Sequence, residues 1–251
     1  MSKGLLIINA DDWGLDPAAT DAILACWRAG AVSSATALVW MADSDRAAGL
    51  ARDERLPLGL HLNLIEPFTA PDVPARVAAT QRRVAERLRH GGIVAHLYHP
   101  RWAADFERCI ADQLERFDEL YGRPPTHFDG HRHMHLVSNA LFARALAPLT
   151  RCRRPINRLQ HESTASNQGA RELLHQLVRI RFGTTRWCFS LRPMIPSAGG
   201  PGVSTKLALA RRSSVEVVVH PIWSEEQAVL ASAGWRELLQ SHPLGSFEDL
   251  G

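Results

Sequence analysis

The chain has 251 residues, of which 45% are hydrophobic and 22% charged, and its formal net charge is +3. This composition is ordinary for a soluble globular protein and excludes a disordered or fibrous chain. The net charge is too small to indicate a nucleic-acid partner. Only Lys3 and Lys206 are lysines among the 29 basic residues, and the arginines are scattered and form no continuous basic arm.

The sequence shows no sign of a membrane span or an export signal. No apolar run approaches the roughly 20 residues that a membrane helix needs. The apolar run near the N-terminus is broken by Asn9 and two aspartates, unlike that of a signal peptide. The four cysteines show no Cys-x-x-Cys spacing, which favours reduced and mostly buried thiols. We therefore expect a cytoplasmic protein.

In chain order, short apolar runs alternate with helical patterns from end to end. The apolar runs predict strands at residues 5–8, 36–40, 58–62, 126–129, 155–159 and 215–219. The helical patterns lie at residues 17–29, 44–52, 77–88, 105–121, 139–149, 172–181 and 224–240. Asp16 and Ser224 are the expected N-caps of the first and last helices. This order predicts a parallel sheet with right-handed crossovers.

The alternation continues without an internal repeat or a linker, so we predict one α/β barrel-like domain over residues 1–251. Residues 66–104 depart from the pattern, because they contain several prolines and an arginine-rich helix. They are long for a loop and predict a functional insertion. A barrel of parallel strands carries its active site at the carboxyl ends of the strands, so a site is expected there.

Acidic, histidine and asparagine side chains lie at the ends of four of the predicted strands. They are Asp11 and Asp12, then His61 and Asn63, then Asp129, His131, His133 and His135, and finally His220 before Pro221. Each group alone has an ordinary explanation: an aspartate pair can form an Asx-turn and a helix cap, and a lone histidine is usually structural. Residues two apart on an extended chain face the same way, so His131, His133 and His135 could converge.

Taken together, the four strand ends predict a pocket of nitrogen and oxygen ligands. Such a set suits Zn²⁺, Mn²⁺ or a similar divalent ion with an open position for water. Neighbours on an extended chain point to opposite sides, so Asp11 and Asp12 should not both bind the ion. One would hold the metal and the other would accept a proton from water activated by it.

Four segments carry a resemblance to a known family. They are Ile-Ile-Asn-Ala-Asp-Asp-Trp-Gly-Leu at 7–15, Gly-Leu-His-Leu-Asn-Leu at 59–64, Pro-Thr-His-Phe-Asp-Gly-His-Arg-His-Met-His at 125–135 and Val-His-Pro at 219–221. In order and spacing the sequence resembles the YdjC-like carbohydrate deacetylases, which include chitooligosaccharide (diacetylchitobiose) deacetylases and hopanoid-biosynthesis-associated members. The resemblance implies the deformed (β/α) TIM-like barrel of the glycoside hydrolase/deacetylase superfamily.

The resemblance also implies an activity and roles for the residues. The family removes acetate from N-acetylated sugars, usually with Mg²⁺ or Zn²⁺, and it suggests a homodimer. The metal ligands map onto Asp12, His61 and His131. Asp11 falls in the place of the general base and His220 in that of a general acid. The residues expected to line the substrate pocket or support the ligands are Trp13, Asn63, His133 and His135. Asp129 is a candidate hydrogen-bond partner for an imidazole, although a turn role explains it equally well.

Two departures from the family keep other hypotheses open. Trp40 and Ile222 stand where family members often carry other residues, and we expect them to reshape the sugar pocket. One alternative is another barrel metal hydrolase, such as a cyclic-amide hydrolase, but those usually place His-x-His at the end of the first strand. The other is a non-catalytic sugar-binding protein with a vestigial metal site, which only Trp40 and Ile222 support.

Overall fold

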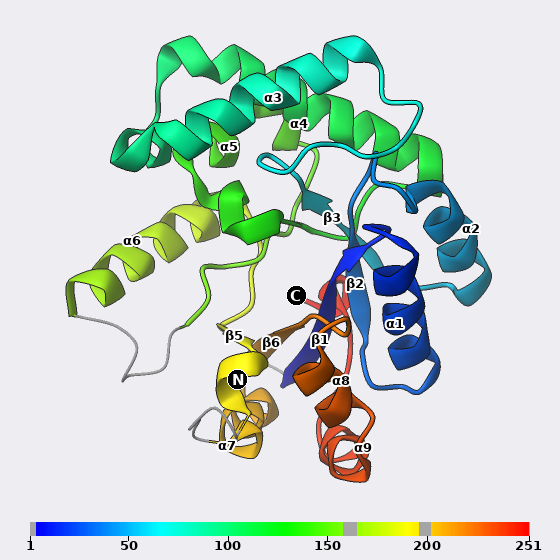
Figure 1. Ribbon diagram of the computed structural model, residues 1–251. Coiled ribbons are helices and arrows are strands. Elements are labelled where there is room, and N and C mark those ends of the chain that lie inside the picture. Colours follow the sequence, from blue (N-terminus) through cyan, green and yellow to red (C-terminus); the bar gives the residue numbers. More distant parts are fainter. Residues whose placement is uncertain (1–3, 158–164, 196–201, 251) are drawn as a thin grey trace.

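The computed structural model describes residues 4–157, 165–195 and 202–250 (Figure 1). Six parallel strands form one sheet in the order β4-β3-β2-β1-β6-β5. The strands are β1 (Leu5–Trp13), β2 (Ser34–Ala37), β3 (Leu58–Leu62), β4 (Phe128–Gly130), β5 (Trp187–Ser190) and β6 (Ser214–Val219). The first strand pairs with the last, from Leu5 opposite Ser214 to Ala10 opposite Val219.

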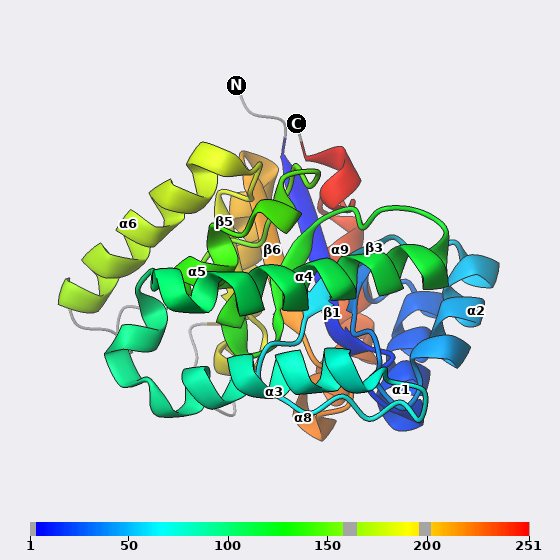
Figure 2. The ribbon, with the colours of Figure 1, turned by 90° about the horizontal axis from the view of Figure 1, so that it is seen from above.

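Helices are arranged around the strands, and α3 and α4 lie side by side (Figures 1 and 2). Their bounds are α1 (Pro17–Arg28), α2 (Ser44–Glu54), α3 (Ala75–His90), α4 (Pro100–Tyr121), α5 (Ser138–Leu141), α6 (Ala165–Arg181), α7 (Val203–Leu207), α8 (Ser224–Leu230) and α9 (Ala233–Gln240). No helix within the described ranges is long and apolar enough to cross a bilayer.

An extended segment, residues 151–157, joins the two edges of the curled sheet. At the β4 edge, Phe128 N donates to Arg151 O at 3.1 Å and Arg153 N donates to Phe128 O at 3.0 Å. At the β5 edge, Asn157 N donates to Cys188 O at 2.7 Å. These bonds close the sheet into an irregular barrel, so the predicted deformed α/β barrel is confirmed.

The barrel has a polar interior and an apolar floor. Along β1, Ile8 and Ala10 belong to the large core beneath the helices, whereas the alternate residues face inwards. Ile7 packs on Phe247 from the C-terminal 3-10 helix (Phe247–Asp249), which fills the floor. His127 stacks on the same ring, with a centroid separation of 3.6 Å. The chain's last turn therefore supports the strands that carry the site.

Gly59 on β3 leaves room for the His127 ring, which predicts a large effect of adding one methyl group. A Cβ at residue 59 would lie 2.4 Å from Cε1 of His127, and Phe247 blocks that ring from moving away. We expect Gly59→Ala to lower the free energy of unfolding by about 1–3 kcal/mol, the usual cost of overpacking. Urea unfolding measures this directly.

Gly49→Ala is the matched control for that measurement. Gly49 lies inside α2, and a Cβ there meets no heavy atom within 4 Å. Because alanine loses less backbone entropy than glycine in a helix, this variant should gain about 0.5–1 kcal/mol. Equal unfolding midpoints for the two variants would contradict the packing described for Gly59.

Several boundaries differ from those predicted. The first strand continues past Ile8 to Trp13 and so contains the aspartate pair. Strand β5 was not predicted. The helix expected at 139–149 is reduced to α5 and a 3-10 turn (Arg144–Leu146). Residues 155–157 form no strand, and the rest of the strand expected at 155–159 lies outside the described residues.

The predicted helix caps give one agreement and one correction. Asp16 caps α1 as expected, since its Oδ1 accepts from Ala19 N at 2.8 Å. The helix expected at 224–240 is two helices, because Ser232 caps α9 by accepting from Trp235 N at 3.1 Å. Ser224 is not an N-cap: the backbone places Trp223 in that position.

Candidate metal centre

A bulge near the end of β1 turns Asp12 into the site. The pairing of β1 with β2 shifts register between Ala10 and Trp13, and Asp12 has a φ of +73°. On a regular strand Asp12 would point away from the barrel interior that Asp11 faces. The bulge instead brings Asp12 Oδ1 to 3.0 Å from His131 Nδ1 and 3.4 Å from His61 Nε2.

Three side chains from distant parts of the chain meet at this point. The ligand atoms of Asp12, His61 and His131 all lie within 4.8 Å of one another. Asp12 and His61 are buried, and His131 is partly exposed. The structure thus brings together the three residues that the sequence predicts as metal ligands, with one side open towards solvent. One carboxylate and two imidazoles are a donor set that can hold a divalent metal ion.

His61 is oriented for metal binding by Asp129. Its Nδ1 lies 2.7 Å from Asp129 Oδ1, so that nitrogen carries the proton and donates it. Its Nε2 is buried, makes no hydrogen bond within the described ranges and faces Asp12 Oδ1 at 3.4 Å, so once deprotonated it can bind a metal ion there. A carboxylate that holds one ring nitrogen and frees the other is the usual support of a metal-binding histidine. The residues present therefore fit a metal ion.

The carboxylates around His61, which are those of Asp129, Asp11 and Asp12, favour a positive charge between them. Burial lowers the pKa of His61, but Asp129, Asp11 and Asp12 outweigh it and raise the pKa to about 9. For Asp12, burial raises the pKa, but the hydrogen bond from His131 and the charge of His61 hold it below its usual value. Either a proton or a cation can supply the charge that these carboxylates require.

Arg153 is the functional residue that sequence reasoning missed. Its guanidinium is fully buried and donates to both carboxylate oxygens of Asp11 at 2.7 Å. It also lies 2.6 Å from Asp129 Oδ2 and 2.6 Å from Glu216 Oε1. One arginine on the closing segment thus pairs with three carboxylates from β1, β4 and β6. No local pattern around Arg151-Cys152-Arg153-Arg154 predicts this.

Asp11 belongs to the arginine cluster rather than to the metal trio. Besides Arg153, it accepts from Asn9 Nδ2 at 3.0 Å and Thr36 Oγ1 at 3.1 Å. Burial raises its pKa, but Arg153 and the nearby histidines outweigh it and hold the pKa well below its usual value. Its Oδ2 lies 4.0 Å from His220 Nε2. The two adjacent aspartates therefore have separate surroundings, as expected.

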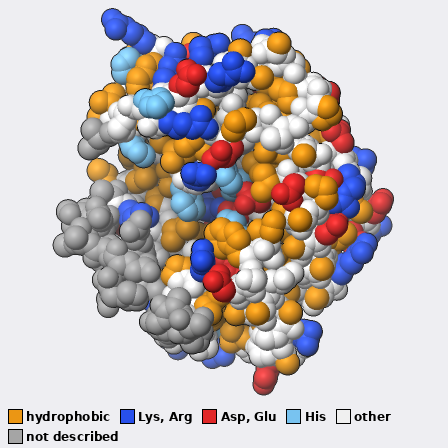
Figure 3. Space-filling model, viewed as in Figure 1, with side chains coloured by type: hydrophobic (Ala, Val, Ile, Leu, Met, Phe, Trp, Pro, Cys, Tyr) orange, Lys and Arg blue, Asp and Glu red, His pale blue; other side chains and the backbone are white. Residues whose placement is uncertain are grey.

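His220, directly after β6, is held in place by Trp223 and Glu226. Its ring stacks on Trp223 at 4.2 Å, and its backbone N donates to Glu226 Oε2 at 2.6 Å. Arg192 lies over the same Trp223 ring. Burial lowers the pKa of His220 and outweighs the charges of Asp11 and Asp12, which favours the neutral imidazole. Histidine and acidic side chains gather near the centre of the face shown in Figure 3.

The three alternate histidines do not converge, which corrects the interpretation from their spacing. Residues 131–136 form a turn, and Arg132 and His133 have φ values of 52° and 61°. In this left-handed backbone the alternation of an extended strand is lost. Of the three alternate histidines, only His131 lies beside Asp12 and His61. His133 is exposed, and His135 is buried with its Nε2 3.3 Å from Arg153 O.

Two other residues expected in the substrate pocket are also buried. Trp13 has no exposed surface, so a sugar cannot stack on it in this structure. Asn63 is 1% exposed, and its side chain binds the backbone of Ile65 and Glu66 within a turn. Trp40 packs on Phe68 at 5.2 Å, whereas Ile222 is 42% exposed.

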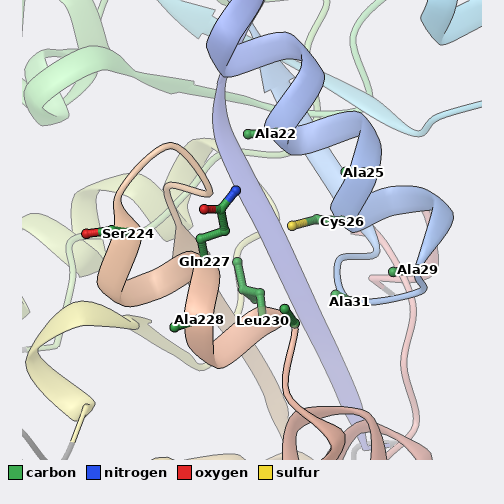
Figure 4. A pocket seen from close by; sticks show the side chains of 10 residues that line it. Ala22, Ala25, Cys26, Ala29, Ala31, Ser224, Gln227, Ala228 and Leu230 are labelled. Carbon is green, nitrogen blue, oxygen red and sulfur yellow. The ribbon is translucent and has the colours of Figure 1, made fainter.

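A cavity of about 380 Å³ lies between α1 and α8, away from this site (Figure 4). Small or apolar side chains line most of it, including Ala22, Cys26 and Leu230. None of the candidate site residues lines the cavity, and it offers no grouped charges.

Sequence comparison shows which known proteins this chain is similar to. A carbohydrate deacetylase from Homo sapiens is 37% identical over 146 residues, which cover 56% of this chain and 45% of the human protein. A chitooligosaccharide deacetylase from Yersinia pestis (strain Pestoides F) is 33% identical over 178 residues, which cover 67% of this chain and 66% of that protein. The matches thus span about half of the human protein's length and just under two thirds of the bacterial one's.

A solved structure and a family model complete the comparison. The crystal structure of a candidate cellobiose-phosphate cleavage protein from Enterococcus faecalis V583 has a TM-score of 0.72, with 21% identity over the full length of both chains. That likeness shows a shared fold. The family model described as YdjC-like protein matches residues 5–242. The chain therefore belongs to the YdjC-like protein family.

Proposed function

We propose that this protein is a metal-dependent carbohydrate deacetylase, which removes the N-acetyl group from an amino sugar or an N-acetylated glycan. The observation that carries the proposal is the trio of Asp12, His61 and His131, with the free Nε2 of His61 aimed into it and a second aspartate nearby. The deacetylases among its relatives support the reaction and the substrate class.

The donor set favours zinc over magnesium. Two imidazoles and one carboxylate are the ligands of many catalytic zinc sites, whereas Mg²⁺ prefers oxygen ligands and water. When bound, such an ion supplies a Lewis acid for the acetamide carbonyl and lowers the pKa of water. Side chains of the protein carry out the proton transfers.

Asp11 and His220 provide the proton path. Asp11 stays ionised beside Arg153 and is the carboxylate that would accept a proton from the attacking water, although its lowered pKa makes it a weak base that holds the proton only transiently. A carboxyl group with a low pKa gives up that proton easily. His220 Nε2, neutral and 4.0 Å away, can take it and pass it to the departing amine of the sugar. The distance exceeds a hydrogen bond by about 1 Å, so the groups must approach during the reaction.

Replacing His220 with phenylalanine tests the proton path with the least structural damage. Phenylalanine keeps the stacking on Trp223 but cannot carry a proton. We expect acetate release from N-acetylated sugars to fall by about 10²–10⁴-fold, the usual contribution of an acid–base group. Zinc affinity, measured by calorimetry, should stay unchanged because His220 lies outside the trio.

The same assay distinguishes an enzyme from a binding protein. A panel of N-acetylated sugars is incubated with the zinc-loaded wild-type chain, and released acetate is measured. Turnover that survives in His220→Phe would remove His220 from the mechanism. No acetate from any sugar, with zinc bound and sugars binding, would favour the sugar-binding alternative.

Metal affinity should rise with pH, because the metal and a proton compete for His61. A protonated imidazole has no lone pair to donate, and the pKa of His61 is about 9 without metal. The apparent affinity for zinc should therefore increase about tenfold per pH unit between about pH 6 and 8. Calorimetric titration at several pH values checks this. An affinity that stays constant over that range would exclude His61 as a titrating ligand.

Two further expectations belong to this proposal. The four cysteines are buried and unpaired, which supports work in the reducing cytoplasm. A homodimer stays a prediction from the family resemblance, and light scattering of the full chain measures it.

A further inference from the structure

The net positive charge of the chain is concentrated in α3 and the first turns of α4, because residues 109–121 at the other end of α4 carry four acidic residues and one arginine. Residues 75–108 contain seven arginines and three acidic residues, Glu86, Asp105 and Glu107, whereas the rest of the chain has 22 basic and 23 acidic residues. Seven of the 27 arginines of the chain therefore lie in this one stretch. Residues 87–104, which we call the rim segment, contain no acidic residue at all.

Three large apolar side chains protrude from the rim segment. Val94, Leu97 and Tyr98 are 46%, 58% and 54% exposed, and they lie within five residues of one another. Exposed Arg89 and Arg101 flank them on either side. A single exposed leucine needs no explanation, but a cluster of apolar side chains ringed by cations is typical of a binding surface.

The rim segment is anchored to two residues that follow the turn containing His131. Ser138 Oγ donates to His96 O at 2.8 Å. Asn139 and His99 exchange two hydrogen bonds, of 2.8 and 3.0 Å. Ser138 and Asn139 follow the turn that presents His131, so the segment lies on the strand-end side of the barrel. Basic and histidine side chains are visible along the upper edge of the same face in Figure 3.

We propose that the rim segment docks this protein on an anionic lipid surface. Val94, Leu97 and Tyr98 would enter the headgroup region, where a tyrosine ring is favoured, while Arg89 and Arg101 meet lipid phosphates. The charge selects an anionic surface over a neutral one. This is peripheral binding, which needs no spanning helix. The proposal does not depend on the deacetylase assignment.

Co-sedimentation of the full chain with vesicles tests the proposal. Vesicles of phosphatidylcholine with phosphatidylglycerol should bind the wild-type protein, vesicles of phosphatidylcholine alone should bind it weakly, and salt at about 0.5 M should release it. Arg101→Ser should weaken binding about fivefold. Leu97→Glu should weaken it at least about tenfold, since it removes apolar contact and adds a like charge.

Ile180→Glu is the matched control, because Ile180 on α6 is 79% exposed and lies outside the rim segment. It should bind vesicles as the wild type does. The proposal is overturned if the wild-type protein does not bind the anionic vesicles, or if Leu97→Glu binds them as tightly as the wild type does. Binding to immobilised polyglutamate but not to vesicles would instead assign the surface to an acidic protein. If Leu97→Glu binds vesicles as the wild type does but has a raised KM for a soluble sugar, the rim segment contacts the substrate instead.

Discussion

Arg153→Met should lower the free energy of unfolding by about 3–5 kcal/mol at pH 7, the usual cost of breaking a buried ion cluster. Arg153 is fully buried and pairs with Asp11, Asp129 and Glu216. Without it, these three carboxylates remain together in the barrel interior and lose the guanidinium that they share. Urea unfolding, followed by circular dichroism, measures the loss.

The pH dependence of that loss identifies its cause. Carboxylates left without Arg153 have raised pKa values in the folded variant, so their penalty is present at high pH and falls as they take up protons. The deficit of Arg153→Met should therefore shrink between pH 7 and 5. The exposed pair of Arg28 and Glu54 provides the control, since Arg28→Met should cost no more than about 1 kcal/mol. A pH-independent deficit, or one as small as the control's, would contradict the role given to Arg153.

His61→Ala should remove metal binding and turnover together. His61 is the one residue of the trio with a buried ring nitrogen, its Nε2, that makes no hydrogen bond within the described ranges. Loss of a residue that merely supports a ligand already costs about 10- to 100-fold in metal affinity, so loss of the ligand should cost more than about 100-fold. Asp129→Asn keeps all three ligands but weakens the support of His61 and one ion pair of Arg153, so its loss of metal affinity should fall within the smaller range.

The control for His61→Ala is His90→Ala, at the exposed end of α3. It should keep both zinc affinity and acetate release, and thermal unfolding of each variant shows whether the fold survives. Folded His61→Ala protein that still binds zinc with wild-type affinity would show that the ion lies elsewhere.

The region of the trio could be predicted because it follows from topology, whereas the choice of Asp12, His61 and His131 within it came from the family resemblance. Carboxyl ends of parallel strands meet at one edge, so side chains after β1, β3 and β4 must lie near one another whatever the details. The same argument placed His220 after β6. Strong apolar runs such as 58–62 and 215–219 also gave strand positions within one residue of those observed.

The remaining features depend on contacts that a local pattern does not contain. The bulge at Asp12 and the left-handed turn at Arg132 and His133 are backbone conformations fixed by neighbouring segments. The turn reversed the expectation, based on strand alternation, that the three histidines converge. Arg153 is buried only because three distant carboxylates balance its charge. Trp13 and Asn63 carry the family motif, but packing rather than sugar contact explains their positions.

A crystal structure of the protein grown with zinc, with anomalous diffraction measured at the zinc absorption edge, tests the central claim most directly. One ion should lie between Asp12, His61 and His131, with the Nε2 of His61 as a ligand and Asp11 still paired with Arg153. An ion bound elsewhere, or none in a protein that releases acetate from N-acetylated sugars, would contradict it.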